Sequence, residues 1–368
     1  MIILAIDTSC DETAAAVTEE IRILSNIIWS QASLHAKFGG VYPTLAKRMH
    51  QERIDWVIGK AITNSKTQIS SLDAVAVTIG PGLAPALEVG IKYAIKLTKK
   101  YNKPLIPVNH VEGHLFSPLA RPKNSQSPIS NFQLPTSKLF PCLGLVVSGG
   151  TTQLILAKDL GKYKILANTI DDALGEALDK GARLLGLGYP GGAVLEKIAR
   201  LHNVSAKQFQ ENTYSLPLPM LGRENEGKFS YSGLKTALAR TVSKIKNQKG
   251  SLSKSDIQEL ASTYQDVAFS HLIRIISNTI YHLPFTIHHL LVSGGVASNL
   301  TLRKKIRKMA KELNITPLFP YSKKLCTDNA AMIGVCAFLK TKRPSAIIKP
   351  KLASKIDRAP KFSIEDVL

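Results

Sequence analysis

Two histidines four residues apart are the first candidates for chemistry in this chain. His110 and His114 follow an apolar stretch, and side chains at helix positions i and i+4 lie on one face, about one turn apart. Two imidazoles in that arrangement can bind one divalent ion. The spacing can also arise by chance among nine histidines. A carboxylate late in the chain, Asp328, would complete a set of three ligands and favours a metal site.

A polar turn after the first apolar run holds three carboxylates. Asp7, Asp11 and Glu12 follow directly on an apolar run that begins at Met1. Acidic groups in such a turn can organise a metal–phosphate complex or assist proton transfer. The alternative is that they are solvated residues at the turn of a hairpin. The residues by themselves leave both interpretations open.

Two serine–glycine–glycine turns each come directly after an apolar strand, at residues 148–150 and 293–295. Backbone amides in glycine turns and at helix starts can approach an anion closely. A single turn of this kind is common in proteins and is weak evidence for a binding site. Two of them, in a chain that also carries an acidic turn in its first half, favour a site that holds nucleotide phosphates.

Composition limits the class of protein. A chain of 368 residues with 44% hydrophobic content can bury one or two cores, and two lobes are expected. The 48 Lys and Arg residues against 27 Asp and Glu give a net charge of +21. This favours a polyanionic partner, either nucleic acid or an anionic membrane surface. The alternative is that lysines are simply scattered over solvated faces.

Cysteine usage and the first residues predict a cytoplasmic protein. The four cysteines are widely spaced and form no CxxC pair, so neither a disulfide framework nor a zinc ribbon is expected. The N-terminal run has no basic leader or cleavage pattern. No stretch of about 20 apolar residues is present for a membrane span.

The elements that must position these residues follow from hydrophobic periodicity and glycine or proline punctuation. In the first half the predicted elements are strands at 1–6, 14–17, 74–78 and 104–108 and helices at 45–62 and 86–97. In the second half they are strands at 143–147, 153–157 and 289–292 and helices at 256–281, 300–312 and 328–339. Trp29 and Trp56 lie in apolar periodic context and are predicted to pack in the core.

The second half restarts the scheme of the first, because strand, polar turn and strand at 143–157 repeat the order of residues 1–17. This predicts an internal duplication. The expected organisation is an N-terminal lobe at 1–120, an exposed Ser-, Asn- and Pro-rich linker or insertion at 121–141, a C-terminal lobe at 142–340 and a basic tail at 341–368. Part of the final helix, about 328–340, is expected to complete the N-terminal lobe.

Several ordered motifs resemble the TsaD family of tRNA threonylcarbamoyl transferases, from about residue 1 to 340. They are the segments 5–13, 110–114, 147–150, 171–173, 175–180, 189–192, 229–230, 232–235, 294–299 and 326–329. The Glu-Gly-His form at 112–114 and the Leu-Gly-Tyr-Pro-Gly-Gly run at 187–192 look like the bacterial branch. The resemblance implies an α/β fold of the actin, sugar-kinase and Hsp70 type, with duplicated ribonuclease-H-like lobes and a nucleotide cleft between them.

The resemblance also implies a reaction. Members move the threonylcarbamoyl group from threonylcarbamoyl-AMP to the N6 amine of the adenosine just 3′ of the anticodon, and AMP is released. The acceptors are tRNAs that read codons beginning with A. On this basis the chain is expected to be a tRNA-modifying acyltransferase.

Site residues follow by resemblance, position by position. His110, His114 and Asp328 would bind one divalent metal ion per subunit, with iron(II) as the first expectation and zinc(II) as the second. The ion would act as a Lewis acid during acyl transfer. Asp11 and Glu12 match acidic residues that would assist the acceptor amine. The matching adenylate-binding positions are Val146, Val147, Ser148, Gly149, Gly150, Asp179, Gly192 and Asn299.

Several positions depart from the family pattern, including Pro85 and Glu88 in a stretch that is usually small and apolar. Thr151 stands where bacterial members usually have His, Leu218 where Arg is usual, and Thr44 where an acidic residue is usual. Thr151 keeps a hydroxyl but loses an ionisable ring, and Leu218 removes a fork of donors. These changes leave the metal and nucleotide sets intact and bear on tRNA contact and partner interfaces.

A basic stretch at 300–312 is the candidate tRNA contact. Arg303, Lys304, Arg307 and Lys308 could follow phosphates with a salt-sensitive affinity, and a solvated helical face is the equal alternative. By resemblance the partners are tRNA, threonylcarbamoyl-AMP, a paralogous subunit of the same fold (TsaB-like), which pairs through the first lobe, and a small P-loop ATPase (TsaE-like). No membrane partner is expected.

Three other functions were compared with the transferase. A kinase of the same fold superfamily would not need the paired histidines. A metalloprotease helix carries His-Glu-x-x-His, whereas here Val111 intervenes and moves Glu112 by about 100 degrees around the helix. A non-catalytic scaffold subunit of the same tRNA-modification complex is the main alternative. Retention of all three metal-ligand positions argues against it.

Overall fold

The computed structural model describes residues 1–35, 38, 40–124, 139–188, 191–205 and 213–367. Contacts divide the chain into two compact units. Unit 1 contains Met1–Cys142, Ala157–Lys164 and Leu318–Leu368, and unit 2 contains Leu143–Leu156 and Ile165–Pro317. Most of the predicted linker at 121–141 lies outside the described residues, as do residues 189 and 190 of the motif at 189–192.

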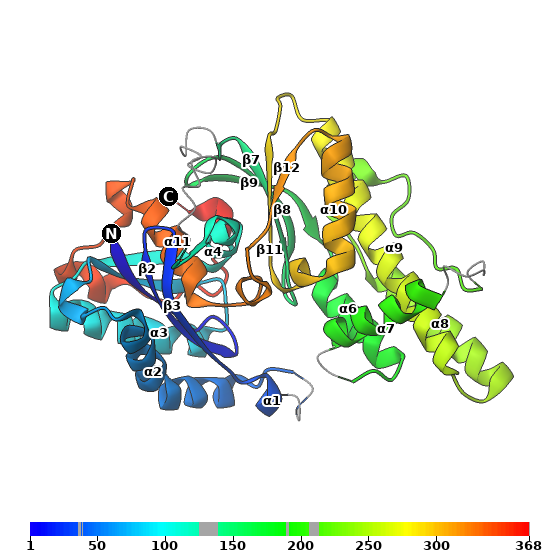
Figure 1. Ribbon diagram of the computed structural model, residues 1–368, viewed down its shortest axis with the longest axis horizontal. Helices are drawn as coiled ribbons and strands as arrows, with labels where there is room; N and C mark the ends of the chain where they lie inside the picture. The colour runs from blue at the N-terminus through cyan, green and yellow to red at the C-terminus, as the bar shows by residue number, and fades with distance from the viewer. Residues whose placement is uncertain (36–37, 39, 125–138, 189–190, 206–212, 368) are drawn as a thin grey trace. The chain divides into compact units, whose positions relative to one another are not determined.

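Unit 1 is built on a six-stranded sheet with the order β5-β4-β1-β2-β3-β6 (Figure 1). Its strands are β1 (Ile2–Asp7), β2 (Glu12–Glu19), β3 (Arg22–Ser30), β4 (Ala74–Gly80), β5 (Leu105–Asn109) and β6 (Arg121–Pro122). β1, β2 and β3 form an antiparallel meander, while β4 is parallel to β1 and β5 is parallel to β4. The carboxyl ends of the three parallel strands therefore meet at one edge, where Asp7 and Asn109 lie.

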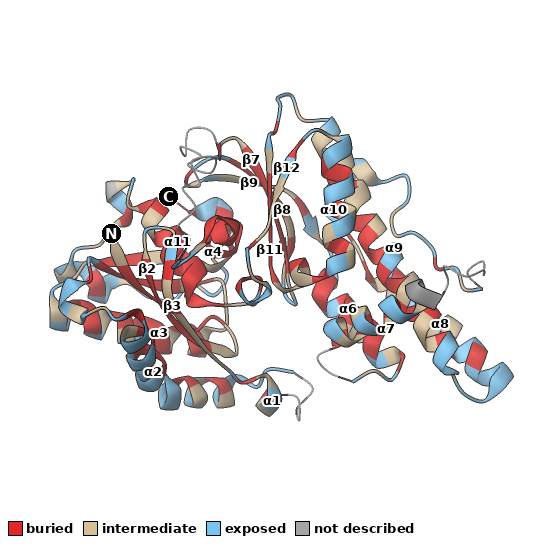
Figure 2. Ribbon diagram, viewed as in Figure 1, coloured by how far each residue is buried: buried red, intermediate tan, exposed pale blue. Residues whose placement is uncertain are grey.

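Helices cover both faces of this sheet. They are α1 (Ala32–His35), α2 (Pro43–Ser65), α3 (Ala84–Tyr101), α4 (His110–Phe116) and α11 (Ala330–Lys340). Val17 of β2 belongs to the apolar core shared with α2 and α3, whereas its neighbour Thr18 meets Gly334 of α11. Because successive strand residues point to opposite faces, α11 lies on the face opposite to α2 and α3. Figure 2 shows the buried strands of this unit between its helices.

Unit 2 is built on a second six-stranded sheet with the order β10-β9-β8-β7-β11-β12. Its strands are β7 (Cys142–Val147), β8 (Thr152–Asp159), β9 (Lys162–Thr169), β10 (Lys228–Phe229), β11 (His289–Ser293) and β12 (Thr316–Leu318). Its helices are α6 (Leu174–Leu184), α7 (Gly191–Ser205), α8 (Ser232–Lys249), α9 (Lys254–Tyr281) and α10 (Leu300–Glu312). A capping box formed by Ser253 and Asp256 starts α9, because each side chain accepts from the other's backbone amide.

Short 3-10 helices complete the chain. They are η2 (Ile69–Ser71), η3 (Ser117–Leu119), η5 (Glu224–Glu226), η6 (Gly295–Ser298), η7 (Lys323–Leu325), η8 (Pro344–Ala346), η9 (Pro350–Lys355) and η10 (Ile364–Asp366). Within the described residues, none of the helices combines the length and the apolar character that crossing a bilayer requires.

The two sheets share one strand order, which confirms the predicted duplication. β7, β8 and β9 take the places of β1, β2 and β3, and β11 lies parallel to β7 as β4 lies parallel to β1. β12 then occupies the place of β5. The polar turn at 148–151 therefore corresponds to the acidic turn at 8–11, so the two candidate binding turns are equivalent positions of one scaffold.

Most predicted elements are confirmed to within a few residues. Several elements have no counterpart in the prediction, among them β3, β9, α6, α7 and α8. Two further details are corrected. The last helix begins at Ala330, so Asp328 lies before it rather than in it. Trp29 packs against the core as expected, but Trp56 of α2 is 54% exposed. The residue lies off the helix face that holds the buried Val57.

The basic tail is attached to unit 1 along the sheet. Ile348 forms an antiparallel bridge with Leu105 of β5. Further on, the amide of Ala359 donates to the carbonyl of Ile79 in β4. The tail therefore reaches the carboxyl edge of the first sheet, next to the residues that carry the candidate metal ligands.

Candidate active site

The helix that carries both histidines starts directly at the end of β5. Asn109 is its N-cap, and the side-chain oxygen accepts from the amides of the second and third helical residues at 2.9 and 3.1 Å. The same side chain donates to the carbonyls of Phe362 and Ser363 in the tail, at 3.0 and 3.3 Å. His110 is thus the first residue of α4. The preceding Asn109 fixes this helix start and ties it to the C-terminal tail.

The three predicted metal ligands converge. Nε2 of His114 lies 3.1 Å from Oδ1 of Asp328, and Nε2 of His110 lies 3.6 Å from the same oxygen. The two imidazole rings are nearly perpendicular, with centroids 4.7 Å apart. One ligand atom from each residue lies within 4.8 Å of the others. Two helical residues and one residue from a loop 214 positions later therefore face a common point.

These residues fit a divalent metal. Two imidazole nitrogens and a carboxylate oxygen suit either zinc or iron. Among the described residues, the buried Nδ1 atoms of both histidines and Oδ1 of Asp7 have no hydrogen-bond partner. Asp7 is fully buried at the end of β1, and its Oδ1 lies 3.7 Å from Nδ1 of His110. It is placed to orient that ring from the side away from Asp328, as carboxylates behind metal-binding histidines commonly do.

Charges within the cluster compensate each other in the metal-free chain. Burial disfavours the ionised form of Asp328, but His110 and His114 hold the pKa of this carboxyl far below its usual range. Burial likewise opposes the charged form of His110, but the carboxylates of Asp328 and Asp7 raise its pKa to about 10. His110 is therefore protonated at neutral pH when no metal is bound, and a metal ion would replace that proton.

The two candidate catalytic acids lie in the turn beside this cluster. Asp11 precedes β2 and Glu12 is its first residue, accepting from the Ser30 hydroxyl at 3.1 Å. Burial, followed by the charges of Asp328 and Asp11, raises the pKa of Glu12 to about 9. Glu12 is thus electrically coupled to Asp328. No direct bond joins Asp11 or Glu12 to the three ligands among the described residues.

A buried histidine of α2 supports the acidic turn and was not predicted from the sequence. Nε2 of His50 lies 3.0 Å from the carbonyl oxygen of Cys10, and its Nδ1 lies 2.8 Å from the hydroxyl of Thr13. Burial lowers the pKa of His50, so the ring stays neutral and can donate at one nitrogen while accepting at the other. No local sequence signal marks this residue, because its role depends on a contact 40 positions away.

In unit 2 the predicted adenylate positions form a compact turn and its support. Val146 and Val147 are fully buried in β7, so only their backbone could meet a ligand. The Ser148 hydroxyl accepts from the amides of Gly150 and Thr151, at 3.3 and 3.0 Å. A Cβ atom placed on either glycine of the turn would meet nothing within 4 Å. The turn is therefore closed by its own serine and open on its outer side.

The second glycine turn, at 293–295, packs against the strand that leads into the first turn, at 148–150. Gly294 has a φ of +89°, and a Cβ atom there would lie 2.3 Å from the Val147 carbonyl oxygen. Only glycine permits this approach. The predicted anion-binding turn and the Gly294 turn are consequently in direct backbone contact.

The remaining adenylate positions already have protein partners. Oδ1 of Asp179 accepts from the amide of Gly192 at 2.7 Å, and burial raises the pKa of this carboxyl. Asn299 is the N-cap of α10, and its amide group donates to Oε1 of Gln265 at 2.8 Å. The structure thus gives Asp179 and Asn299 local supporting roles that the sequence interpretation did not include.

The candidate tRNA residues differ in their surroundings. Lys304, Arg307 and Lys308 are exposed on α10, whereas Arg303 is half-buried and its Nε donates to the Ala297 carbonyl at 2.6 Å. Among the departures from the family pattern, Leu218 is 42% exposed, and Thr44 is exposed in the first turn of α2. Thr151 contributes to the turn through its backbone.

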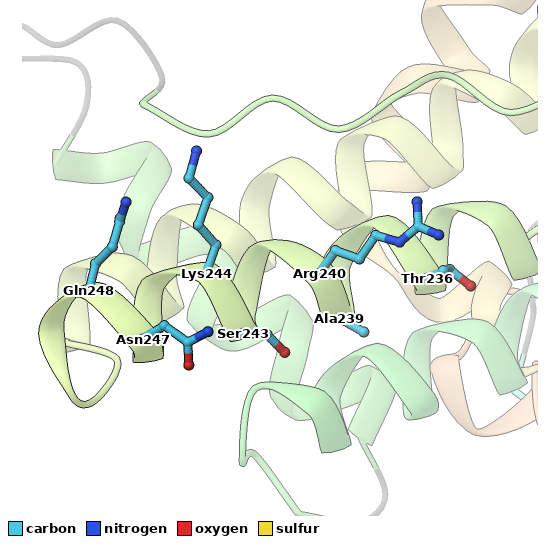
Figure 3. Close-up of a pocket in the computed structure, with 7 residues that line it drawn as sticks. All are labelled: Thr236, Ala239, Arg240, Ser243, Lys244, Asn247 and Gln248. Carbon is cyan, nitrogen blue, oxygen red and sulfur yellow. The ribbon is translucent and has the colours of Figure 1, made fainter.

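A cavity of unit 2 lies away from these positions. It has a volume of about 620 Å³ and follows α8 (Figure 3), and none of the predicted site residues line it. Its lining residues are Thr236, Ala239, Arg240, Ser243, Lys244, Asn247 and Gln248. These residues are rich in hydrogen-bond donors and include no carboxylate, so the cavity favours anions. They form no recognisable catalytic or metal-binding group.

Solved structures of other proteins share this fold. Component A of (R)-2-hydroxyglutaryl-CoA dehydratase from Acidaminococcus fermentans is 12% identical, with a TM-score of 0.50 over 93% of this chain and 100% of that chain. Full-length HypF is 13% identical, with a TM-score of 0.53 over 93% of this chain and 46% of HypF. The expected fold of the actin, sugar-kinase and Hsp70 type is confirmed.

Sequence relatives give the family. The family described as TsaD, tRNA N6-adenosine threonylcarbamoyltransferase, matches residues 22–335. The protein of that name from Caldicellulosiruptor bescii is 41% identical over 344 residues, which are 93% of this chain and 94% of the relative. The one from Bartonella henselae is 39% identical over 375 residues, covering 97% of this chain and 96% of the relative. This chain belongs to the TsaD family of tRNA N6-adenosine threonylcarbamoyltransferases.

Proposed function

We propose that this chain transfers a threonylcarbamoyl group from threonylcarbamoyl-AMP to the N6 amine of the adenosine 3′ of the anticodon, with release of AMP. The acceptors are tRNAs that read codons beginning with A. The observation that carries the proposal is the convergence of His110, His114 and Asp328 on one point, in a chain of the TsaD family. A scaffold subunit without chemistry would have no need of this set.

The metal proposal rests on the same three side chains. They would hold one divalent ion, iron(II) in the first place and zinc(II) in the second. The bound ion would supply Lewis-acid stabilisation of negative charge on the transferred group. Asp7 holds the ring of His110 from behind, and the protonated imidazole of the metal-free chain gives way when the site is loaded.

Proton transfer is assigned to the acidic turn. The acceptor amine loses a proton when its nitrogen forms the new bond to the carbamoyl carbon. A carboxylate oxygen of Asp11 or Glu12 takes that proton, and the raised pKa of Glu12, about 9 in the metal-free chain, makes its carboxylate a strong base when it is ionised. His50 keeps this turn in place through Cys10 and Thr13.

The adenylate is assigned to unit 2. The open backbone at Gly149 and Gly150 can approach the phosphate, supported by Val146, Val147 and Ser148. Asp179 can accept from ribose hydroxyls, next to Gly192 and Asn299. The tRNA backbone is assigned to α10 through Arg303, Lys304, Arg307 and Lys308, in keeping with the net charge of +21.

The proposed partners are a paralogous subunit of the same fold (TsaB-like) and a small P-loop ATPase (TsaE-like), in the cytoplasm. Exposed aromatic side chains around the start of α2 and on its outer face support an interface on unit 1: Phe38, Tyr42 and Trp56 are 54–61% exposed. The rings of Phe38 and Tyr42 stack with centroids 5.7 Å apart, and clustered exposed apolar groups of this kind mark interaction sites. Four free cysteines agree with a reducing compartment.

The test is a direct assay of the product. The purified chain is incubated with iron(II) or zinc(II), the two candidate partners, threonylcarbamoyl-AMP and unmodified tRNA. The tRNA is then digested, and threonylcarbamoyladenosine is measured by mass spectrometry. We expect product that depends on this chain and on an adenosine at the acceptor position. Absence of product, beside a relative of this family that works in the same mixture, would refute the transferase proposal.

A further inference from the structure

A buried glutamate separates the two histidines of α4. Glu112 is fully buried, and its carboxylate has two donors: Nζ of Lys340 at 3.0 Å and the hydroxyl of Tyr163 at 2.8 Å. Lys340 is itself only 5% exposed. Burial and the neighbouring Glu112 raise the pKa of Tyr163 well above its usual value, so it remains a phenol that donates. None of these three residues takes part in the proposed reaction.

The carboxylate faces away from the metal ligands. Each helical residue turns by about 100 degrees, so Glu112, two residues from both histidines, points to the opposite side of α4. Its bond to Lys340 also removes it as a base beside the metal. The metalloprotease alternative required such a base, and it therefore loses its one candidate residue.

The ion pair joins the two elements that supply all three ligands. α4 carries His110 and His114, while α11 follows Asp328 directly and ends at Lys340. The two helices pack side by side (Figure 1). A Cβ atom at Gly113 would lie 2.8 Å from Cδ1 of Ile333 of α11, so the absence of a side chain at this position permits the close approach.

A seven-residue helix such as α4 is unstable by itself in water. Its position and orientation therefore depend on its contacts with the rest of the protein. The N-cap Asn109 fixes the start of α4, but apolar contacts with α11 are non-directional and do not by themselves set the register of the two helices. A buried charge pair has one bonded arrangement, and a wrong register would leave both charges unpaired at a large cost. Such pairs add little to stability over apolar side chains of similar volume, so their presence calls for another role.

We propose that the Glu112–Lys340 ion pair, with Tyr163 as its second donor, is a positioning device that sets the register of α4 against α11 so that His110, His114 and Asp328 meet at the metal. The inference rests on the metal centre of the proposed function. It concerns positioning residues that touch neither the metal nor the substrates.

The decisive variant replaces both charges with groups of similar shape. Glu112→Gln combined with Lys340→Met leaves no unpaired charge, so the double variant should fold. Either single change would leave the other residue as an unpaired buried charge. Affinity for Zn²⁺ is measured by competition with a chelator, and the visible spectrum of the Co²⁺-loaded chain reports the geometry of the ligands. Thermal unfolding of the metal-free chain reports stability. Lys47→Met, which breaks the more exposed pair of Lys47 with Glu88, is the matched control.

We expect the double variant to bind Zn²⁺ about tenfold to a hundredfold more weakly, as for other residues that orient metal ligands, with an altered Co²⁺ spectrum and little change in unfolding temperature. Tyr163→Phe should weaken binding less, and Lys47→Met should change nothing. A double variant that binds Zn²⁺ like the unaltered chain would overturn the proposal. So would one that does not fold, because the pair would then serve stability. If the unaltered chain bound no metal, the metal centre itself would fail instead.

Discussion

Unit 1 presents buried charge at the carboxyl ends of its parallel strands, whereas unit 2 presents open backbone at the equivalent place. Asp7 is fully buried and His114 is 2% exposed. In unit 2, Gly149 and Gly150 have free space around their α-carbons. A cation needs charged or polarisable side chains, and these must have partners when they leave water. An anion can be held by backbone amides alone. One duplicated scaffold thus offers two equivalent places whose chemistry suits ligands of opposite charge.

The two turns are also supported differently. The acidic turn of unit 1 depends on His50, a side chain from another helix that bonds to Cys10 and Thr13. The turn of unit 2 is closed by its own Ser148 and packs against the backbone of Gly294, whose φ of +89° only glycine adopts readily. The first site is therefore sensitive to the chemistry of distant side chains, and the second to the absence of a single Cβ atom.

The largest effect is expected from the metal ligands of unit 1. His110→Ala, His114→Ala and Asp328→Ala should each lower transfer by more than about a thousandfold, since several kcal/mol of charge stabilisation are lost and each 1.4 kcal/mol is tenfold. Metal content and product formation are measured together, with circular dichroism to check the fold. His288→Ala, at an exposed histidine of unit 2, is the control. Full activity in all three variants would remove the metal mechanism.

A pair of glycine variants tests the opposite region. Gly294→Ala places a methyl group 2.3 Å from the Val147 carbonyl oxygen at a φ of +89°, so it should destabilise the chain by more than about 1 kcal/mol and weaken adenylate binding. Gly149→Ala meets no atom within 4 Å and should leave the unfolding temperature unchanged while still weakening the adenylate. Calorimetry for unfolding and titration with AMP give both values. If the two variants lost equal stability, the support assigned to Gly294 would be wrong.

The sequence predicted most elements and the metal set because both depend on local patterns. The i, i+4 spacing of His110 and His114 is visible in the chain, and the helix at 300–312 agrees with α10 at both ends. The error at Asp328 was also local. Asn329 is an N-cap residue whose side chain accepts from the amide of Met332, and such residues mark a helix start that the apolar pattern alone does not give.

What the sequence could not give are the partners from distant segments. Glu112 and Lys340 are separated by 228 positions, and Asn109 bonds to carbonyls 253 and 254 positions later. No periodicity encodes such contacts, because they depend on how helices and tail pack on the sheet. Trp56 shows the same limit in reverse: its apolar neighbours predicted burial, yet it is 54% exposed.

The buried carboxyl group of Glu12 should make the stability of the metal-free chain depend on pH. Glu12 keeps its proton up to a pKa of about 9 in the folded metal-free chain, against about 4.5 for an ordinary glutamate. The folded chain then holds more protons than the unfolded chain between these values, so its stability falls as pH rises through this window. Glu12→Gln removes this part of the dependence.

We therefore expect the unfolding temperature of metal-free Glu12→Gln, relative to that of the unaltered chain, to increase by a few degrees in total as pH rises from 5 to 9. Scanning calorimetry across that range gives the comparison. Asp179→Asn in unit 2, where burial also raises the pKa of the carboxyl, is the matched variant. A constant difference between Glu12→Gln and the unaltered chain at every pH would contradict the raised pKa of Glu12, which is due first to burial and then to the charges of Asp328 and Asp11.

The smallest effects are expected on α10. Lys304 and Lys308 are exposed, whereas Lys305 is tied to Asp266 by an ion pair of 2.8 Å. If the first two contact tRNA phosphates, Lys304→Ala and Lys308→Ala should each weaken tRNA binding a few-fold and lower the slope of log affinity against log salt by about one. Lys305→Ala should change the slope less, because its charge is already neutralised. Binding is measured by filter retention at several salt concentrations with full-length tRNA. Slopes equal to that of the unaltered chain in all three variants would show that α10 is a solvated face, and the anion-favouring residues along α8 would then be the next candidates on unit 2.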